Sequence, residues 1–292
     1  MRVVIIGGVA GGMSAATRLR RLDESAEIIV LERSGHVSYA NCGLPYYVGG
    51  VIAEEDKLYL QTPDSLHKRF RLDVRVHHEV TEIAADKKVV IARDLISGTE
   101  SEISFDKLIL SPGATPVVPP IPGIERALTL RTVEDVLRIY DAVETKPKRA
   151  VVIGGGFIGV EMAENLIHKG VSTSLIEALP QVLGPLDPEM AEIVHKEMRK
   201  HGLDLHLANS VKEITDSKVI LADGTEVEAD LVIAAIGVKP DTHLAKLAGI
   251  KIGAKGGRNG RTGGFAANPA LARIAGAKGG RISRRRKASD IA

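Results

Sequence analysis

The sequence of 292 residues lacks several features, and each absence excludes a class of protein. Its single cysteine, Cys42, cannot form an intramolecular disulfide, which excludes a secreted disulfide-stabilised scaffold. No apolar run approaches the ~18 residues of a membrane-spanning helix, so we do not expect an integral membrane protein. The N-terminus runs directly into a strand pattern and lacks the cleavage region of a signal peptide. We therefore expect a cytoplasmic protein.

The composition that remains is that of a globular protein, with 44% hydrophobic and 26% charged residues. At ~150 residues per domain, the length suggests two domains. The formal net charge of +2 conceals an asymmetry. Residues 1–252 carry 29 basic and 36 acidic side chains, whereas residues 253–292 carry 10 Lys and Arg against one Asp. The last 40 residues are therefore strongly basic, whereas the rest of the chain is acidic.

A pattern of strand, glycine-rich turn, helix, strand and acidic residue occurs twice, over residues 3–32 and again over residues 149–177. The strands are continuous apolar runs, as expected for strands buried on both faces of a parallel sheet. Between the two copies, residues 73–110 alternate short β-type runs with turn signals, which is typical of a β-meander. The sequence therefore predicts an α/β fold with two Rossmann-like dinucleotide-binding units.

The second copy contains the spacing Gly-x-Gly-x-x-Gly at Gly154, Gly156 and Gly159. These glycines allow a tight turn, close backbone approach to a pyrophosphate, and close packing of helix on sheet. The helix N-terminus adds unpaired N–H groups for the phosphates. Glu177 ends the next strand, where a carboxylate accepts hydrogen bonds from a ribose diol and repels a 2′-phosphate. We therefore predict an NADH site, with NADPH left open.

The first copy departs from this spacing. Its turn reads Gly7, Gly8, Val9, Ala10, Gly11 and Gly12. Valine stands at the middle position, where the spacing requires glycine, but Glu32 ends the next strand as expected for a ribose ligand. An ordinary strand–helix turn without a ligand is the alternative. Two units in one chain suggest two dinucleotides, most simply a flavin and a nicotinamide.

Cys42 follows the first copy, in the run Ser-Tyr-Ala-Asn-Cys-Gly-Leu-Pro-Tyr-Tyr. Pro45 suits the first turn of a helix, which would place Cys42 near a helix N-terminus. The dipole there favours the thiolate, which is the reactive form. A buried structural cysteine is the other interpretation, and the residues by themselves leave both open.

Together these segments resemble the single-cysteine branch of the FAD-dependent pyridine nucleotide–disulfide oxidoreductases. Within it they are most similar to coenzyme A-disulfide reductases, with NADH oxidases and peroxidases as near relatives. Besides the glycine turns and the cysteine run, Ser-Pro-Gly-Ala at 111–114 and Ala-Ile-Gly-Val-Lys-Pro at 235–240 carry the resemblance, which extends to about residue 252.

The resemblance implies that NAD(P)H reduces FAD, and that reduced FAD passes electrons to Cys42, which reduces coenzyme A disulfide or a related disulfide. The lone cysteine agrees, because dithiol members of the family need two. An NADH oxidase or peroxidase using a cysteine sulfenic acid is an alternative. A catalytically impaired nucleotide-binding fragment is another.

The resemblance also implies the site residues. Cys42 is the expected catalytic residue, and no metal site is expected. The expected FAD-binding residues are Gly7, Gly8, Val9, Ala10, Gly11, Gly12, Glu32, Arg33, Val80, Ser111, Pro112 and Gly113. The other expected cofactor-binding residues are Gly154, Gly156, Phe157, Ile158, Gly159, Glu161, Glu177 and Gly237. The expected coenzyme A-binding residues are Ser14, Arg18, Arg21, Ser38 and Asn41, of which the cations suit phosphates.

By this resemblance, an FAD-binding domain spans 1–115, an NAD(P)-binding domain spans 116–240, and a returning FAD-domain segment begins at 241–256. The family's C-terminal dimerisation domain is not recognisable, although family members are homodimers. Residues 257–292 are rich in Gly, Ala and Arg and are expected to be disordered. We expect a truncated product of a reading-frame shift near residue 257. A basic arm for nucleic acid or an acidic membrane is the alternative; we expect neither partner.

Overall fold

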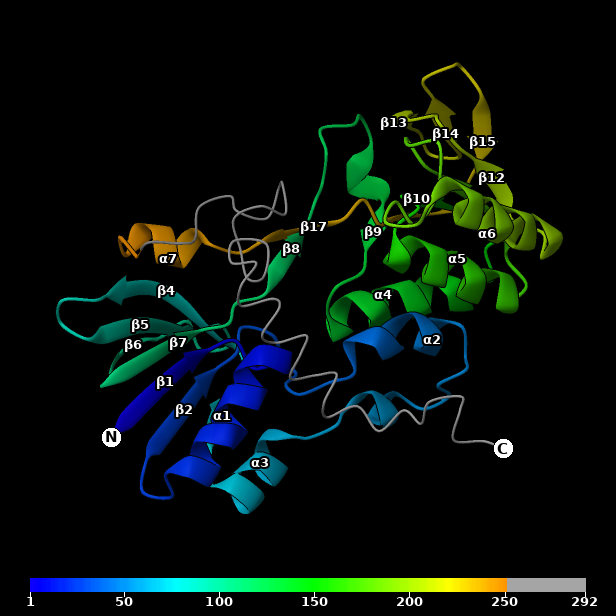
Figure 1. Ribbon diagram of the computed structural model, residues 1–292. Coiled ribbons are helices and arrows are strands. Elements are labelled where there is room, and N and C mark those ends of the chain that lie inside the picture. Colours follow the sequence, from blue (N-terminus) through cyan, green and yellow to red (C-terminus); the bar gives the residue numbers. More distant parts are fainter. Residues whose placement is uncertain (251–292) are drawn as a thin grey trace, which may run out of the picture. The chain divides into compact units, whose positions relative to one another are not determined.

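The computed structural model describes residues 1–250 (Figure 1). The expected basic segment 257–292 and the expected frame shift lie outside these residues, as do residues 251–256 of the segment 241–256. All helices and strands below belong to one unit, Met1–Ala248. No helix within residues 1–250 is both long enough and apolar enough to cross a bilayer.

The first parallel sheet is built from the first βαβ copy. Its strands are β1 (Arg2–Ile6), β2 (Glu27–Leu31), β3 (Asp73–Arg75) and β7 (Lys107–Leu110), in the order β3-β2-β1-β7. Helices α1 (Ala10–Leu22) and α3 (Pro63–Phe70) lie on one side of it (Figure 1). Val3 and Ile5 pack in the cluster that includes the helix residues Ala16 and Leu66.

The opposite face of this sheet is also buried. Val4 and Ile6 pack in a second cluster with Val90 and Ile103 of an antiparallel sheet. That sheet is the expected meander, formed by β4 (His78–Ala84), β5 (Val89–Asp94) and β6 (Glu100–Ser104). Burial on both faces explains why these strands are continuous apolar runs.

The second parallel sheet repeats this arrangement. Its strands are β9 (Leu128–Thr129), β10 (Arg149–Ile153), β11 (Ser172–Ile176), β12 (Asp204–His206) and β16 (Leu231–Ala234), in the order β12-β11-β10-β16-β9. The helices are α2 (Leu44–Val48), α4 (Val133–Glu144), α5 (Phe157–His168) and α6 (Pro188–Lys200). Val152 packs with residues of α2, α4 and α5 in one cluster, whereas Val151 packs in another with Val219 and Val227.

Those last two residues belong to a three-stranded antiparallel sheet of β13 (Val211–Ile214), β14 (Lys218–Leu221) and β15 (Glu226–Glu228). The turn at Asp223–Gly224 joins β14 to β15 in a hairpin, and the next strand, β16, belongs to the parallel sheet. Each parallel sheet thus has helices on one face and a small antiparallel sheet on the other.

Two short strands carry the chain between the nucleotide units. They are β8 (Ala114–Pro116) and β17 (Val238–Pro240), which pair antiparallel with each other. Helix α7 (His243–Leu247) follows β17, and its Leu244 packs in the cluster beneath the meander. The short turns are η1 (Asn41–Gly43), η2 (Glu55–Leu58) and η3 (Ile124–Arg126). The α/β fold with two Rossmann-like units predicted from the two copies is confirmed.

Candidate functional site: two nucleotide cavities and an exposed cysteine

A cavity of about 480 Å³ opens at the carboxyl ends of β1 and β2. The expected cofactor residues on its wall are Gly7, Val9, Ala10, Gly11, Glu32, Arg33, Val80, Ser111, Pro112 and Gly113. Gly8 and Gly12 lie behind the wall, where they permit close packing. A Cβ on Gly12 would overlap the carbonyl oxygen of Gly7, and a Cβ on Gly8 would press on the side chains of Val37 and Glu32. The first glycine turn therefore shapes the wall of a cavity as well as a strand–helix junction.

The N-terminus of α1 faces this cavity without a side-chain cap. Val9 is the N-cap residue and makes no capping hydrogen bond, and the first helical turn contains no acidic residue. Ala10 and Gly11, which begin the helix, line the cavity. The first N–H groups of a helix have no intrahelical partner and carry its positive dipole end. This end of α1 is suited to an anionic ligand such as a diphosphate.

Glu32 is held by two residues of its own unit, Gly8 and Ser34. Its Oε2 accepts a hydrogen bond of 2.7 Å from the N–H of Gly8, and its Oε1 accepts two of 2.8 Å from the N–H and the hydroxyl of Ser34. A carboxylate has about four acceptor sites. Glu32 therefore keeps acceptor capacity for a ribose diol while its orientation is fixed.

A second cavity, of about 450 Å³, lies at the carboxyl ends of β10 and β11. The expected residues on its wall are Gly154, Gly156, Glu177 and Gly237. Each position of the motif favours glycine for a different structural reason. Gly154 has φ +108° and a Cβ on Gly159 would overlap its carbonyl oxygen, whereas a Cβ on Gly156 would meet no atom within 4 Å. The open space at the middle glycine is where a pyrophosphate can approach the backbone.

Glu177 repeats the arrangement of Glu32. Its Oε2 accepts a hydrogen bond of 2.5 Å from the N–H of Gly155, and its Oε1 accepts one of 2.7 Å from the N–H of Leu179. Helix α5 begins after Gly156 with no side-chain cap and no acidic residue in its first turn. The second unit therefore presents the same combination of a free helix N-terminus and an oriented carboxylate.

The other expected residues of α5 do not line this cavity. Phe157 is 62% exposed and Ile158 is also exposed. Glu161 is half-buried, and burial followed by the charge of Glu164 raises the pKa of its carboxyl group. Helix α5 packs against α2, the helix that follows Cys42, and the charge of Glu161 acts on Tyr46 of α2.

Cys42 is exposed, which contradicts the interpretation as a buried structural cysteine. It lies in η1, directly before α2, and Pro45 stands in the first turn of α2 as expected. Tyr46, on α2, has its pKa raised by the charge of Glu161, by burial, and by Glu164 and Cys42. Cys42 therefore shares a polar surface with a phenol and two carboxyl groups.

The expected coenzyme A-binding residues do not lie together in one cavity. Asn41 lines the first cavity, whereas Ser14, Arg18 and Arg21 are exposed on α1 outside its wall. Ser38 is half-buried, and its N–H donates to the carbonyl oxygen of Gly8.

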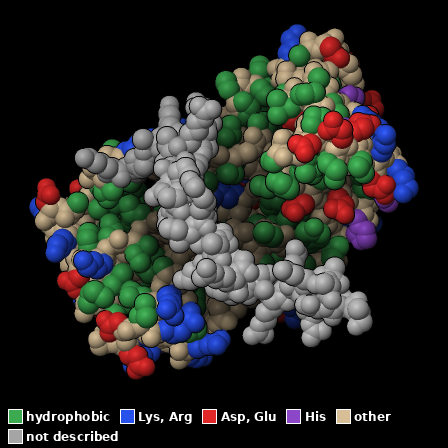
Figure 2. All heavy atoms as spheres, viewed as in Figure 1, with side chains coloured by type: hydrophobic (Ala, Val, Ile, Leu, Met, Phe, Trp, Pro, Cys, Tyr) green, Lys and Arg blue, Asp and Glu red, His purple; other side chains and the backbone are tan. Residues whose placement is uncertain are grey.

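The surface over α1 and α3 is basic (Figure 2). The exposed cations there are Arg18, Arg21, Lys68 and Arg69. A third arginine of α1, Arg20, is 7% exposed and donates to the carbonyl oxygens of Phe70 and Arg71. Arg20 therefore joins α1 to the end of α3, and only its neighbours are available to a ligand.

Sequence reasoning missed several residues of the cavities. Arg131, Thr132 and Tyr39 line the first cavity, and Gln181 and Asn209 line the second. Arg131 donates to the carbonyl oxygen of Pro112 at 3.2 Å. For Arg131 and Thr132, the sequence offered one signal, the Thr-x-x-Asp pattern that begins at Thr132 and predicts a helix N-terminus.

These features define a class of protein with two cavities of the same plan, each at the glycine turn of a βαβ unit, and an exposed thiol. A family model of the pyridine nucleotide-disulphide oxidoreductases matches residues 1–261, which extends past residue 252, where the recognised motifs end. The chain belongs to this family. The resemblance seen in the motifs is confirmed.

Individual named relatives are similar to most of this chain. An NADH oxidase of Methanocaldococcus jannaschii is 35% identical over 260 residues, which cover 87% of this chain and 58% of the relative. A coenzyme A disulfide reductase of Staphylococcus epidermidis is 31% identical over 256 residues, again 87% and 58%. The crystal structure of reduced CoADR-RHD from Bacillus anthracis has a TM-score of 0.85 and 47% identity, over 87% of this chain and 47% of that chain. The chain thus spans less than two thirds of these relatives.

Proposed function

We propose that the chain is the nucleotide-binding part of an FAD-dependent NADH:disulfide oxidoreductase in which Cys42 reduces coenzyme A disulfide or a related small disulfide. One observation carries this proposal: two cavities of the same plan stand in one unit with a single exposed cysteine on the loop that leaves the first of them. The relative named as a coenzyme A disulfide reductase supports the substrate class.

We assign FAD to the first cavity. The free N-terminus of α1 and the guanidinium of Arg131 suit its diphosphate. Glu32 suits the adenosine ribose, and Val80 lies on the same cavity wall. When bound, FAD supplies a carrier that takes two electrons from a nicotinamide and passes them to sulfur. The chain's own residues bind and orient it.

We assign NADH to the second cavity. Glu177 would repel the 2′-phosphate of NADPH, and Ala178 and Leu179 beside it on the wall offer no cation to that phosphate. The double variant Glu177→Ala/Ala178→Arg removes the repulsion and adds a cation. We expect its ratio of kcat/KM for NADPH over NADH to rise at least about tenfold, equivalent to ~1.4 kcal/mol. An unchanged ratio would remove Glu177 as the discriminating residue.

At Cys42, the thiolate attacks one sulfur of the disulfide, which forms a mixed disulfide and releases one thiolate. Two electrons from NADH then reduce the mixed disulfide, which restores Cys42 and releases the second thiol. Each turnover consumes one NADH, one proton and one disulfide and yields NAD⁺ and two thiols. Exposure of Cys42 permits the approach of a substrate as large as coenzyme A disulfide.

An NADH oxidase or peroxidase is the second candidate, and the relative named NADH oxidase favours it. The same cysteine would then cycle through a sulfenic acid. NADH consumption that depends on coenzyme A disulfide supports the first function, and consumption that depends on oxygen or peroxide supports the second.

The decisive experiment first titrates the purified chain with FAD and then measures NADH consumption with each acceptor. We expect FAD binding, and loss of disulfide reduction in Cys42→Ser by at least about 10³-fold, the scale for removal of a nucleophile. Ser14→Ala removes an exposed hydroxyl outside the first cavity and tests one of the expected coenzyme A-binding residues in the same assay. Undiminished disulfide reduction by Cys42→Ser would overturn the proposed function.

A further inference from the structure

The segment 33–41 connects two parts of the proposed site, because it runs from Glu32 to Cys42. Ser34, Tyr39 and Asn41 of this segment line the first cavity. Its far end is held by backbone contacts, including the bridge between Tyr39 and Tyr59. Its near end has no regular secondary structure and is held by hydrogen bonds of Ser34 with Glu32 and with the N–H of His77.

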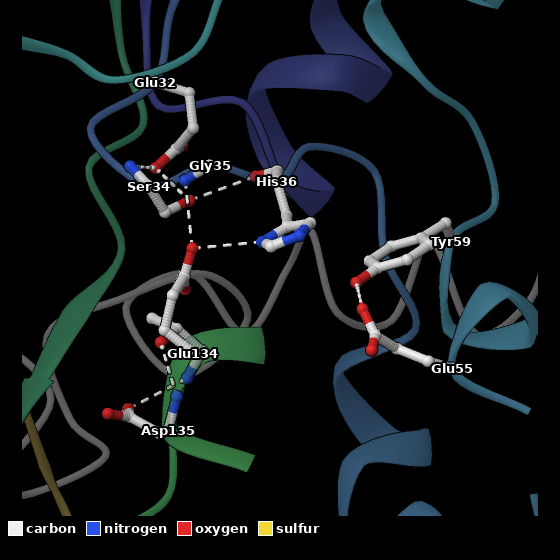
Figure 3. A network of polar contacts seen from close by, with 9 residues as sticks. Glu32, Ser34, Gly35, His36, Glu55, Tyr59, Glu134 and Asp135 are labelled. Atoms are coloured by element: carbon white, nitrogen blue, oxygen red, sulfur yellow. Dashed lines mark hydrogen bonds and ion pairs between the residues drawn. The ribbon is translucent and has the colours of Figure 1, made fainter. Parts of the chain in front are cut away.

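Glu134 holds the next two residues of the segment, Gly35 and His36, from a different part of the chain (Figure 3). Its Oε1 accepts a hydrogen bond of 2.9 Å from the N–H of Gly35 and lies 3.0 Å from Nδ1 of His36. The ring of His36 stacks on Tyr59, with centroids 4.9 Å apart and planes 2° apart. One carboxylate thus joins segment 33–41 to helix α4, about a hundred residues away in sequence.

The charged state of Glu134 is the favoured one. Burial raises the pKa of its carboxyl group, but hydrogen bonds from its own N–H and from Gly35 and His36 outweigh burial and bring the pKa below its ordinary value. The carboxylate lies in the first turn of α4, where the helix dipole also favours a negative charge.

The same helical turn places a cation on the cavity wall. Asp135 closes the N-terminus of α4, because its Oδ2 accepts hydrogen bonds of 3.0 Å from the N–H groups of Arg131 and Thr132. Arg131 and Thr132 line the first cavity. The start of α4 therefore fixes both a cation of the cavity and, through Glu134, the segment that bears Ser34.

We propose that Glu134 is a positioning residue for FAD: it holds segment 33–41 so that Glu32, Arg131 and Cys42 keep their places around one cofactor. This inference rests on the proposed assignment of FAD to the first cavity. Glu134 itself is not on the cavity wall, so its effect passes through Gly35 and His36.

The test compares three variants of one helix. Glu134→Ala removes both contacts, Glu134→Gln keeps an oxygen acceptor for the N–H of Gly35, and Glu144→Ala is the matched control. Glu144 lies at the other end of α4 and contacts Lys169 at 3.1 Å, so the control removes a comparable carboxylate contact away from the cavity. The affinity for FAD is measured by quenching of flavin fluorescence. The second readout is the rate at which dithiobis(2-nitrobenzoate) labels the single cysteine.

We expect Glu134→Ala to weaken FAD binding about tenfold and to raise the labelling rate of Cys42 about threefold or more, the scale for losing hydrogen bonds to a charged group. Glu134→Gln should recover most of the affinity, and Glu144→Ala should match the unaltered chain within about twofold. His36→Phe keeps the stack on Tyr59 but loses the contact with Glu134. It should weaken FAD binding about threefold, which tests the proposal even if Glu134→Ala does not fold.

Equal FAD affinity and equal labelling rates in Glu134→Ala and Glu144→Ala would overturn the positioning role and leave the proposed function intact. Failure of the unaltered chain to bind FAD would overturn the proposed function, and the role of Glu134 toward FAD with it. Weaker FAD binding confined to Glu134→Ala and His36→Phe, with NADH affinity unchanged, would support the inference.

Discussion

The cradle around residues 7–12 and the cradle around residues 154–159 repeat each other hydrogen bond by hydrogen bond. The N–H of Gly7 donates to Leu31 and that of Gly154 to Ile176, at 2.9 and 2.8 Å. The N–H of the next glycine, Gly8 or Gly155, donates in each case to the carboxylate that ends the second strand. These bonds satisfy the backbone and orient an acid, so they are required whichever dinucleotide binds.

The two cradles differ at the middle position of the motif. Val9 packs against a buried cluster that includes Leu44 of α2 and Val133 of α4. Gly156, at the same position in the second cradle, faces open space. The first cradle is therefore joined to the rest of the molecule through its turn, whereas the second is left open to its ligand. The valine that replaces glycine at this position packs against the core, and the cavity beside it is still present.

The largest effect should come from the glycine that both cradles share. In Gly12→Ala and Gly159→Ala the new Cβ would overlap a backbone carbonyl oxygen of the same turn. We expect each to lower the free energy of unfolding by about 2–3 kcal/mol, as for overpacking in a core. Urea unfolding measures this, with Gly184→Ala as control because its Cβ would meet nothing within 4 Å. A large loss of unfolding free energy in one variant and none in the other would show that the two cradles are not packed in the same way.

A smaller and opposite pair of effects should separate the middle positions. Gly156→Ala should leave stability within about 0.5 kcal/mol but weaken NADH binding about tenfold, because the Cβ occupies the approach to the backbone. Val9→Gly should leave FAD affinity within about threefold and lower stability by about 1–2 kcal/mol through lost packing and added chain entropy. Unfolding curves and ligand titrations give both quantities. NADH affinity that is unchanged in Gly156→Ala would remove the functional meaning of the open space.

The smallest effect should be a difference in pH dependence between two glutamates. Because the folded-state pKa of Glu134 lies below the ordinary 4.5, its carboxylate stabilises the fold above that pH, and the stabilisation disappears as pH falls through the folded pKa. Glu161 has a raised pKa, so ionisation of this group destabilises the fold as pH rises above 4.5.

Urea unfolding of Glu134→Gln and Glu161→Gln between about pH 3.5 and pH 7 should therefore show opposite trends relative to the unaltered chain. Glu134→Gln should be less stable near pH 7 and equal at the acid end, and Glu161→Gln should be equal or more stable near pH 7. Parallel trends would show that the environments of these two groups do not differ in the way described.

Much of the fold was predictable because its signals are local. The apolar runs of β1 and β10 and the turns after them predicted two βαβ units, and all of these elements are present. Glu32 and Glu177 were recognised because each stands directly after a strand, and both line a cavity. The exposed position of Cys42 remained open in the sequence, since polar neighbours and a nearby proline do not decide burial.

The rest of the site depends on contacts that local patterns do not encode. Phe157 and Ile158 share a helix with Gly159, but the direction of α5 turns them away from the second cavity. Arg131 precedes an ordinary helix start, and only the packing of α4 brings it to the first cavity.

By itself, the sequence determined the two glycine turns, the acids that follow them and the α/β class, because backbone conformation and strand burial depend on neighbouring residues. Tertiary structure alone decided that Glu134 meets Gly35 and His36, at separations of 99 and 98 residues. Such a contact requires two segments, each with its own local preferences, to be brought together by the packing of α2 and α4 against one core. No periodicity or spacing in the sequence predicts this contact, because it forms only when folding has ordered both segments.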